Sequence, residues 1–143
     1  MITFDDINIG DCLPVLSTEK ISRTTLALYA GASGDYNPIH IDIDFAKSAG
    51  MDDVFAHGML SMAYLGRLLT HWVDQRSIQK IDVRFTAITP LFAQIICTGV
   101  VQKKQLIDEQ EVIEVLVEAK DFNSGEIKIS GIAIINLTEN RNS

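Results

Sequence analysis

The spacing of hydrophobic residues changes part-way along the chain, close to residue 80. Before that point the longest apolar segment runs from about Gly58 to Val73. Its apolar residues recur on nearly every side of a helix, and they are Met59, Met62, Ala63, Leu65, Leu68, Leu69, Trp72 and Val73. A helix that is apolar nearly all round is typically buried, so we predict a central helix with Met59 and Met62 packed in the core.

A second helix is predicted over residues 21 to 33. Ser22 is its candidate N-cap, because a serine side chain can accept a hydrogen bond from the first helical turn. Apolar residues follow at helical spacing, and Gly31 and Gly34 then end the helix, since glycine is the usual residue at a helix C-terminus.

A shorter helix is predicted over Phe45–Ala49, with Asp44 as its N-cap and Gly50 as its stop. The segment between these two helices, residues 35 to 40, cannot be regular helix. Pro38 lacks a backbone donor and forces the residue before it into an extended or turn geometry. We therefore predict a tight irregular turn at this place in the chain.

Beyond residue 80 the hydrophobic period changes from 3.6 to 2, which is typical of strands. Four strands are predicted, over residues 81–87, 91–101, 112–122 and 127–137, with an additional candidate strand near residues 13–17. The links between the four are too short for a crossover helix, so the strands should pair antiparallel. A curved antiparallel sheet wrapped around a long central helix is an α+β hot-dog fold. Such a sheet leaves edges that pairing into a dimer would cover.

The length of 143 residues fits one domain that spans residues 1–143. A chain of this length, with 47% hydrophobic residues, can bury a core without a disulfide or a structural metal. The net charge of −7 argues against a nucleic-acid partner, because phosphate contacts need a basic face. An anionic small ligand needs only a local basic patch, so the charge does not exclude one.

Cys12 and Cys97 stand in no metal-binding or redox spacing, so we expect free thiols in a reducing compartment. The acidic start of the sequence does not have the pattern of a signal peptide. No apolar stretch reaches the ~18 residues that a membrane span needs. We therefore expect a cytoplasmic protein that has no membrane contact.

A candidate catalytic turn lies between the first two predicted helices and reads Gly34-Asp35-Tyr36-Asn37-Pro38-Ile39-His40. Asp35 and His40 are five residues apart with a proline bend between them, so their side chains can converge on one water molecule. A carboxylate and a neutral imidazole can hold such a water and exchange protons with it near neutral pH.

A second candidate segment, Ala56-His57-Gly58-Met59, stands at the start of the predicted central helix. A helix N-terminus offers unpaired backbone N–H groups and the positive end of the helix dipole. Glycine lets a ligand carbonyl approach the backbone closely, and negative charge that develops on its oxygen is stabilised there. The two segments together suit the addition or elimination of water next to a carbonyl group.

These residues carry a resemblance to a known family. The segment Ala30 to Asp42, AGASGDYNPIHID, followed by Ala56-His57-Gly58-Met59, resembles the hydratase motif of the MaoC-like family. Val83-Arg84-Phe85-Thr86-Ala87 is also similar to that family. The family comprises single-hot-dog (R)-specific enoyl-thioester hydratases and 3-hydroxyacyl-thioester dehydratases. The chain looks closest to the small catalytic dehydratase subunits of type II fatty acid synthesis.

The resemblance implies a hydro-lyase that reversibly dehydrates (R)-3-hydroxyacyl thioesters to trans-2-enoyl thioesters, without a metal or a redox cofactor. It implies that Asp35 and His40 form the catalytic dyad and that Asn37 orients the dyad or the water. It further implies that the backbone N–H of Gly58 binds the thioester carbonyl. In the hydration direction His40 would take a proton from water, and Asp35 would deliver one to the α-carbon on the same face.

The implied substrate is an acyl thioester of CoA or of acyl carrier protein. The implied assembly is a homodimer or, alternatively, a heterodimer with another hot-dog subunit. One departure concerns acyl length: some family members carry a serine further along the central helix, where this chain reads Ala63-Tyr64-Leu65-Gly66-Arg67. Two other functions stay open. A hot-dog thioesterase would hydrolyse the thioester, and a non-catalytic acyl-binding partner subunit would be expected to lack the dyad.

Other polar residues are expected to have structural roles. We expect His57 to hold the turn before the central helix and His71 to lie on the surface or at an interface. Asp42 and Asp44 are expected to be turn and cap residues. A less favoured alternative is a metal site formed by Asp35, His40, Asp42 and Asp44. The candidate contacts for a phosphate-bearing carrier are Arg67, Arg76, Lys80, Arg84, Lys103 and Lys104.

Overall fold

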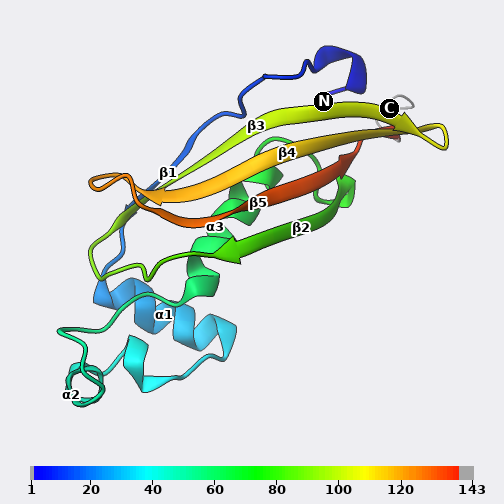
Figure 1. Cartoon of the computed structure of the whole chain (residues 1–143). Coiled ribbons are helices and arrows are strands. Elements are labelled where there is room, and N and C mark those ends of the chain that lie inside the picture. Colours follow the sequence, from blue (N-terminus) through cyan, green and yellow to red (C-terminus); the bar gives the residue numbers. More distant parts are fainter. Residues whose placement is uncertain (1, 139–143) are drawn as a thin grey trace.

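The computed structural model describes residues 2–138, which form an antiparallel sheet with a helix packed against it. The strands are β1 (Leu16–Lys20), β2 (Ile78–Phe85), β3 (Gln94–Ile107), β4 (Gln110–Asp121) and β5 (Ile127–Asn136). The helices are α1 (Arg23–Ser33), α2 (Ile43–Ser48) and α3 (Gly58–Thr70), with short 3-10 helices η1 (Phe4–Asp6), η2 (Pro38–His40) and η3 (Gln75–Ser77). Figure 1 shows α1 and α2 gathered beyond one end of the sheet.

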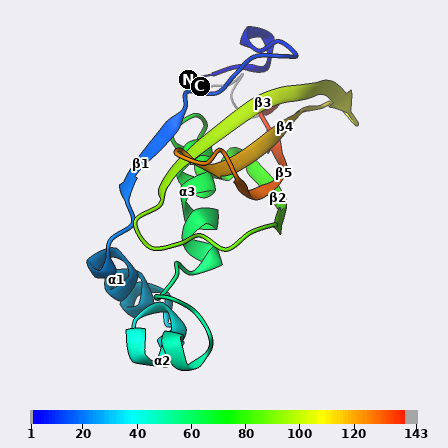
Figure 2. The same cartoon turned by 60° about the vertical axis from the view of Figure 1, so that its left-hand side comes forward.

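The strand order is β1-β3-β4-β5-β2, and every neighbouring pair is antiparallel, as the short links between the strands predict. The helix α3 packs against β1, β3, β4 and β5, and Figure 2 shows the sheet curving over it. Alternate apolar residues of β4, Ile113, Val115, Val117 and Ala119, are all buried. The sheet and helix therefore have the α+β arrangement that the sequence predicts.

The strand β3 differs from its prediction at both ends. It begins at Gln94 rather than at residue 91, because Phe92 has a φ of 66°, a left-handed conformation that does not fit a strand. It continues past residue 101 to Ile107, where it meets β4 through a two-residue turn. Asp108 and Glu109, with φ of 49° and 64°, form this turn and have the positive angles that tight hairpins need.

Two other strands also start at different residues from those predicted. β2 begins at Ile78 rather than at Ile81, because Ile78 already pairs with Ile135 of β5. The candidate strand near residues 13–17 is β1, displaced to Leu16–Lys20. Pro14 has no backbone N–H to give to the sheet, so continuous pairing with β3 starts only after it.

The central helix α3 is buried on one face only. Leu60, Leu65, Leu68 and Leu69 face the sheet and are buried, whereas the side chain of Met59 is 56% exposed. The prediction that Met59 packs in the core is therefore wrong, although Met62 does pack partly buried against it. The reason is that α3 meets the sheet along one stripe, and its other face is left uncovered by residues 2–138. The helix ends at Thr70, earlier than the predicted Val73.

The ends of the first two helices depend on local hydrogen bonds. Ser22 is the N-cap of α1, as predicted, and accepts a hydrogen bond from the N–H of Thr25. Gly34, with a φ of 75°, closes α1 in the left-handed conformation, but Gly31 lies inside the helix and does not end it.

The N-cap of α2 is Asp42 rather than the predicted Asp44. The Oδ1 atom of Asp42 accepts hydrogen bonds from the N–H groups of both Asp44 and Phe45, at 3.0 and 3.2 Å. An aspartate in this position satisfies two helical donors at once, whereas Asp44 is already inside the first turn. No helix within residues 2–138 is both long and apolar enough to cross a membrane.

Candidate active site

The turn from Asp35 to His40 is built by hydrogen bonds between its own residues. The side chain of Asn37 accepts a hydrogen bond from the N–H of Ile39 at 3.1 Å and thereby caps η2, which starts with Pro38. The carboxylate of Asp35 accepts one from the N–H of Asn37 at 3.2 Å. Pro38 interrupts regular helix here, so the backbone N–H groups of the turn need other acceptors, and these side chains supply them. The same bonds fix the path of the chain between Asp35 and His40.

The imidazole of His40 is held by a backbone carbonyl from another part of the chain. Its Nδ1 lies 2.7 Å from the carbonyl oxygen of Phe55, and the two rings meet edge to face at 5.0 Å. The segment that carries Phe55 is itself anchored, because the N–H of Ala56 donates to the carbonyl of Thr89 at 2.9 Å. A carbonyl oxygen only accepts, so Nδ1 carries the proton and Nε2 of neutral His40 keeps its lone pair.

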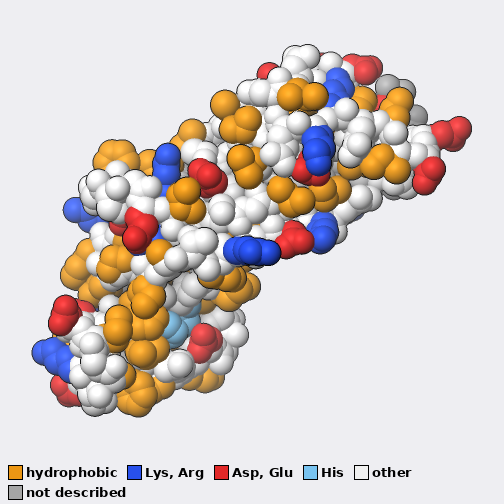
Figure 3. Space-filling model, viewed as in Figure 1, with side chains coloured by type: hydrophobic (Ala, Val, Ile, Leu, Met, Phe, Trp, Pro, Cys, Tyr) orange, Lys and Arg blue, Asp and Glu red, His pale blue; other side chains and the backbone are white. Residues whose placement is uncertain are grey.

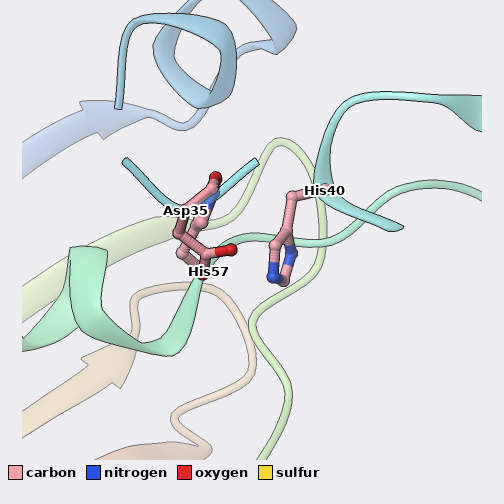
Figure 4. A group of neighbouring side chains, drawn as sticks. All are labelled: Asp35, His40 and His57. Atoms are coloured by element: carbon pink, nitrogen blue, oxygen red, sulfur yellow. The ribbon is translucent and has the colours of Figure 1, made fainter. Parts of the chain in front are cut away.

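His57 joins the two predicted motif segments. Its Nε2 lies 3.1 Å from the carbonyl oxygen of Asp35, and its ring stacks on that of His40 at 4.0 Å with 30° between the planes. Tyr29 of α1 also contacts the His57 ring, edge to face at 4.9 Å. Figure 4 shows the Asp35 carboxylate directed toward the His40 ring. The structure therefore brings Asp35 and His40 together, with His57 packed beside both.

Gly58 is the first residue of α3 and directly follows His57, which is its N-cap. The His57 side chain makes no capping hydrogen bond to the helix, and an N–H in the first turn has no acceptor within the helix. A methyl group at Gly58 would lie 3.1 Å from two atoms of the Phe85 ring. The N-terminus of α3 thus lies beside the dyad. A residue other than glycine at position 58 would place a side chain against the Phe85 ring.

Comparison with known proteins identifies the family. A family model described as "MaoC like domain" matches residues 12–122 of this chain. The chain belongs to the MaoC-like domain family. The resemblance stated from the sequence motifs is therefore confirmed.

Relatives and solved structures agree with this membership. The (R)-specific enoyl-CoA hydratase of Rhodospirillum rubrum is 30% identical over 112 residues, covering 73% of this chain and 75% of that protein. The mouse peroxisomal multifunctional enzyme type 2 is 33% identical over 78% of this chain, which corresponds to 14% of that protein. The chain spans only 3% of a third relative, the fatty acid synthase subunit beta of Saccharomyces cerevisiae, at 33% identity over 46% of this chain.

The R-hydratase PhaJ1 of Pseudomonas aeruginosa superposes with a TM-score of 0.80 at 23% identity, covering 94% of this chain and 84% of that one. A chain of the ChsH1–ChsH2 complex of Mycobacterium tuberculosis superposes with a TM-score of 0.76 at 21% identity, covering 91% and 98%. These likenesses confirm the predicted hot-dog fold of the MaoC-like chain.

The candidate active site also contains three side chains that could hold a metal ion. Asp35, His40 and His57 each offer a ligand atom, and the three atoms lie within 4.8 Å of one another. One nitrogen of each ring already faces a backbone carbonyl, that of Phe55 for His40 and that of Asp35 for His57, so each imidazole has only its other nitrogen left for a ligand. The alternative metal group from the sequence is not supported, because Asp42 caps α2 and Asp44 lies within that helix.

Sequence reasoning missed how the site is braced. It assigned His57 to the turn before α3, but the ring also bonds to the Asp35 carbonyl and stacks on His40. The position of His57 next to Gly58 in the motif was the one sequence feature that could have indicated this contact with the dyad. Tyr29 and the carbonyl of Phe55 carried no signal, because a helix-face tyrosine and a backbone oxygen look the same in any sequence. His71 is exposed at the C-terminus of α3, as predicted.

Most of the candidate carrier-binding cations have partners within the protein. Ion pairs join Arg76 to Asp74, Lys80 to Asp82 and Lys103 to Glu114. Lys104 donates to the carbonyl of Ile7. Arg67 and Arg84 form no ion pair with any residue from 2 to 138. The guanidinium of Arg67 lies over the ring of Tyr64, 6.0 Å from its centroid.

Burial lowers the pKa of His57, and the nearby His40 lowers it further, whereas the hydrogen bond to Asp35 opposes the shift. The pKa of His57 in the folded protein is thus lower than in the unfolded chain, where it is about 6.5. Acid therefore favours the unfolded chain: this contribution to stability is complete above about pH 6.5 and is lost as the pH falls toward the lower, folded value.

We expect the urea midpoint of the wild-type protein to fall between about pH 7 and pH 5, and His57→Gln to remove part of this fall. Gln keeps an N–H donor but cannot take up a proton, so the difference between the two curves isolates His57. Parallel curves for wild type and His57→Gln would contradict the assignment.

Proposed function

We propose that this protein reversibly hydrates trans-2-enoyl thioesters to (R)-3-hydroxyacyl thioesters. The observation that carries the proposal is the meeting of Asp35 and His40 beside the N-terminus of α3, in a chain of the MaoC-like family. The protein is then a hydro-lyase of fatty-acyl metabolism, like its relative named (R)-specific enoyl-CoA hydratase. Figure 3 shows a histidine surface bordered by hydrophobic side chains, which suits a substrate with an apolar tail.

Each residue has a role that its hydrogen bonds allow. Nε2 of His40 accepts a proton from water, whose oxygen bonds to the β-carbon as the double bond breaks, and the carboxylic acid form of Asp35 delivers a proton to the α-carbon on the same face. The proton on His40 then passes to the Asp35 carboxylate, which restores the pair. Dehydration runs these steps backwards, and the protonation states belong to the pair rather than to either residue. Asn37 orients the dyad by capping η2. The N–H of Gly58 binds the thioester carbonyl, where negative charge develops.

The test is an assay with crotonyl-CoA that follows loss of the conjugated double bond and release of free thiol in parallel. A hydratase consumes the double bond and forms (R)-3-hydroxybutyryl-CoA, and a saturated acyl-CoA releases no thiol. Thiol release from the saturated substrate without hydration would instead support the hot-dog thioesterase. Absence of both reactions would support the acyl-binding subunit. Repeating the assay with crotonyl-acyl carrier protein shows which carrier is preferred.

The proposed assembly is a homodimer, with a heterodimer of hot-dog subunits as the alternative. Met59 and Phe85 are 56% and 52% exposed, and large exposed apolar side chains close to a site often mark an interface. A solved relative is named as a two-component complex, ChsH1–ChsH2.

We propose Arg84, which precedes Phe85, as a contact for the carrier phosphate. A cytoplasmic location fits the free thiols of Cys12 and Cys97.

Gly58→Ala is expected to lower kcat/KM for enoyl-thioester hydration by about 10²-fold, because the methyl group restricts approach of the carbonyl to the helix N-terminus. Stability should change little, since the contact at 3.1 Å is to the half-exposed ring of Phe85, which can move. Kinetics and melting temperature measure the two effects separately. Recovery of full activity in Gly58→Ala/Phe85→Ala would show that the ring contact, and not carbonyl binding, caused the loss.

A further inference from the structure

Two buried polar atoms near the dyad have no hydrogen-bond partner among residues 2–138. They are Nδ1 of His57 and Oγ of Ser61, whose residues are 1% and 0% exposed. His57 is the N-cap of α3, and Ser61 follows four residues later, one turn into the helix. Buried polar groups are nearly always hydrogen-bonded, to protein or to ordered water, so the two atoms are candidates to share one bridging water.

The chemistry of the two groups is complementary. Nε2 of His57 faces the carbonyl oxygen of Asp35, which can only accept, so the proton of the neutral ring is on Nε2. Nδ1 is then an acceptor that lacks a donor. The hydroxyl of Ser61 is a donor that lacks an acceptor, and it can rotate to suit.

We propose that Ser61 is a positioning residue for the hydration reaction. Its hydroxyl donates a hydrogen bond to one internal water, which in turn donates to Nδ1 of His57, since no direct bond joins the two atoms in this structure. The ring of His57 is then held at both nitrogens, by Asp35 on one side and by Ser61 on the other. This role rests on the hydratase function proposed above, and it adds a residue that the catalytic motif does not contain.

The fixed ring of His57 acts on the dyad through two contacts. It stacks on His40 at 4.0 Å, and it holds the backbone of Asp35 at 3.1 Å, so rotation of His57 would displace both catalytic groups. Ser61 is 0% exposed and lies on the buried face of α3, so it would act on the dyad through His57 and not through the substrate. Small displacements of catalytic groups reduce turnover strongly, because the reaction depends on their alignment.

The experiment compares Ser61→Ala with Ser77→Ala, which removes the hydroxyl of another buried serine, in η3. We expect Ser61→Ala to lower kcat for crotonyl-CoA hydration about tenfold with KM unchanged, equivalent to about 1.4 kcal/mol of barrier. Ser77→Ala should keep the wild-type kcat. Both variants should lose similar amounts of melting temperature, so a purely structural role would not separate them.

Nitrogen-15 NMR of the imidazole rings tests the hydrogen bond without using activity. In the wild type we expect His57 with its proton on Nε2 and an Nδ1 resonance typical of a hydrogen-bonded acceptor. In Ser61→Ala that resonance should move to the position of a free acceptor. A proton on Nδ1, or an unchanged Nδ1 resonance in Ser61→Ala, would overturn the hydrogen bond, and an unchanged kcat would overturn the positioning role. If the proposed hydratase function is wrong, the wild-type protein will not hydrate crotonyl-CoA. The NMR result does not depend on activity, so the two failures can be told apart.

Discussion

Asp35→Asn is expected to lower kcat/KM for crotonyl-CoA hydration by about 10²-fold or more, and His40→Ala by a similar factor. The amide of Asn cannot deliver a proton to the α-carbon, and alanine removes the imidazole that accepts one from water. In the proposed mechanism the two residues act as a unit in one addition step, so the double variant should lose about as much as the worse single variant. Steady-state kinetics of the three variants measure these effects.

Matched controls are available on the same chain. Asp44→Asn makes the same change at an exposed residue of α2, and His71→Ala removes an exposed histidine at the end of α3. Both should keep wild-type activity, and all of the variants should keep the wild-type circular dichroism spectrum. Wild-type activity in either Asp35→Asn or His40→Ala, with the fold intact, would remove the dyad from the proposed mechanism.

Gly131→Ala is expected to destabilise the protein by more than about 4 kcal/mol, a large part of a typical domain's stability. Gly131 of β5 pairs with Val83 of β2, and a methyl group on it would lie 2.1 Å from the carbonyl oxygen of Asp82. It would also lie 2.6 Å from the Cα atom of Val83. Backbone atoms cannot yield as a flexible side chain does, so β2 must separate from β5. Urea unfolding at constant pH gives the size of the effect.

The same substitution at Gly31 is the control. Gly31 lies inside α1, and a methyl group there would meet no atom within 4 Å. Gly31→Ala should therefore stabilise the protein, by about 0.5 to 1 kcal/mol, because alanine loses less backbone entropy in a helix. If Gly131→Ala has the wild-type urea midpoint, the close approach of β2 and β5 in this structure is wrong.

The local sequence pattern was enough to predict those element ends that depend only on residues close together in the sequence. Ser22 and Gly34 fixed the ends of α1 because capping is a matter of a few adjacent groups. The same kind of reasoning misplaced the cap of α2, since Asp42 and Asp44 are both suitable and only the backbone path decides between them. Alternation of apolar residues gave the strands, but the start of β3 depended on the left-handed Phe92, which no periodicity reveals.

The sequence by itself determined the chemistry that this protein can offer. Two features can be identified from the order of residues alone. One is an aspartate and a histidine on either side of a proline bend, and the other is a glycine at the start of an apolar helix. They suffice to nominate the Asp35/His40 dyad and Gly58, because local turn geometry brings a pair five residues apart close together.

Only the tertiary structure decided which groups brace that chemistry. Phe55 and His57 are far from the dyad in the sequence, yet Phe55 binds the His40 ring and His57 binds the Asp35 backbone. Tyr29, from α1, contacts His57. The exposure of Met59 was settled in the same way, by which face of α3 the sheet covers. Such contacts depend on how distant segments pack, and the free energy of packing is shared over the whole core rather than encoded in any one segment.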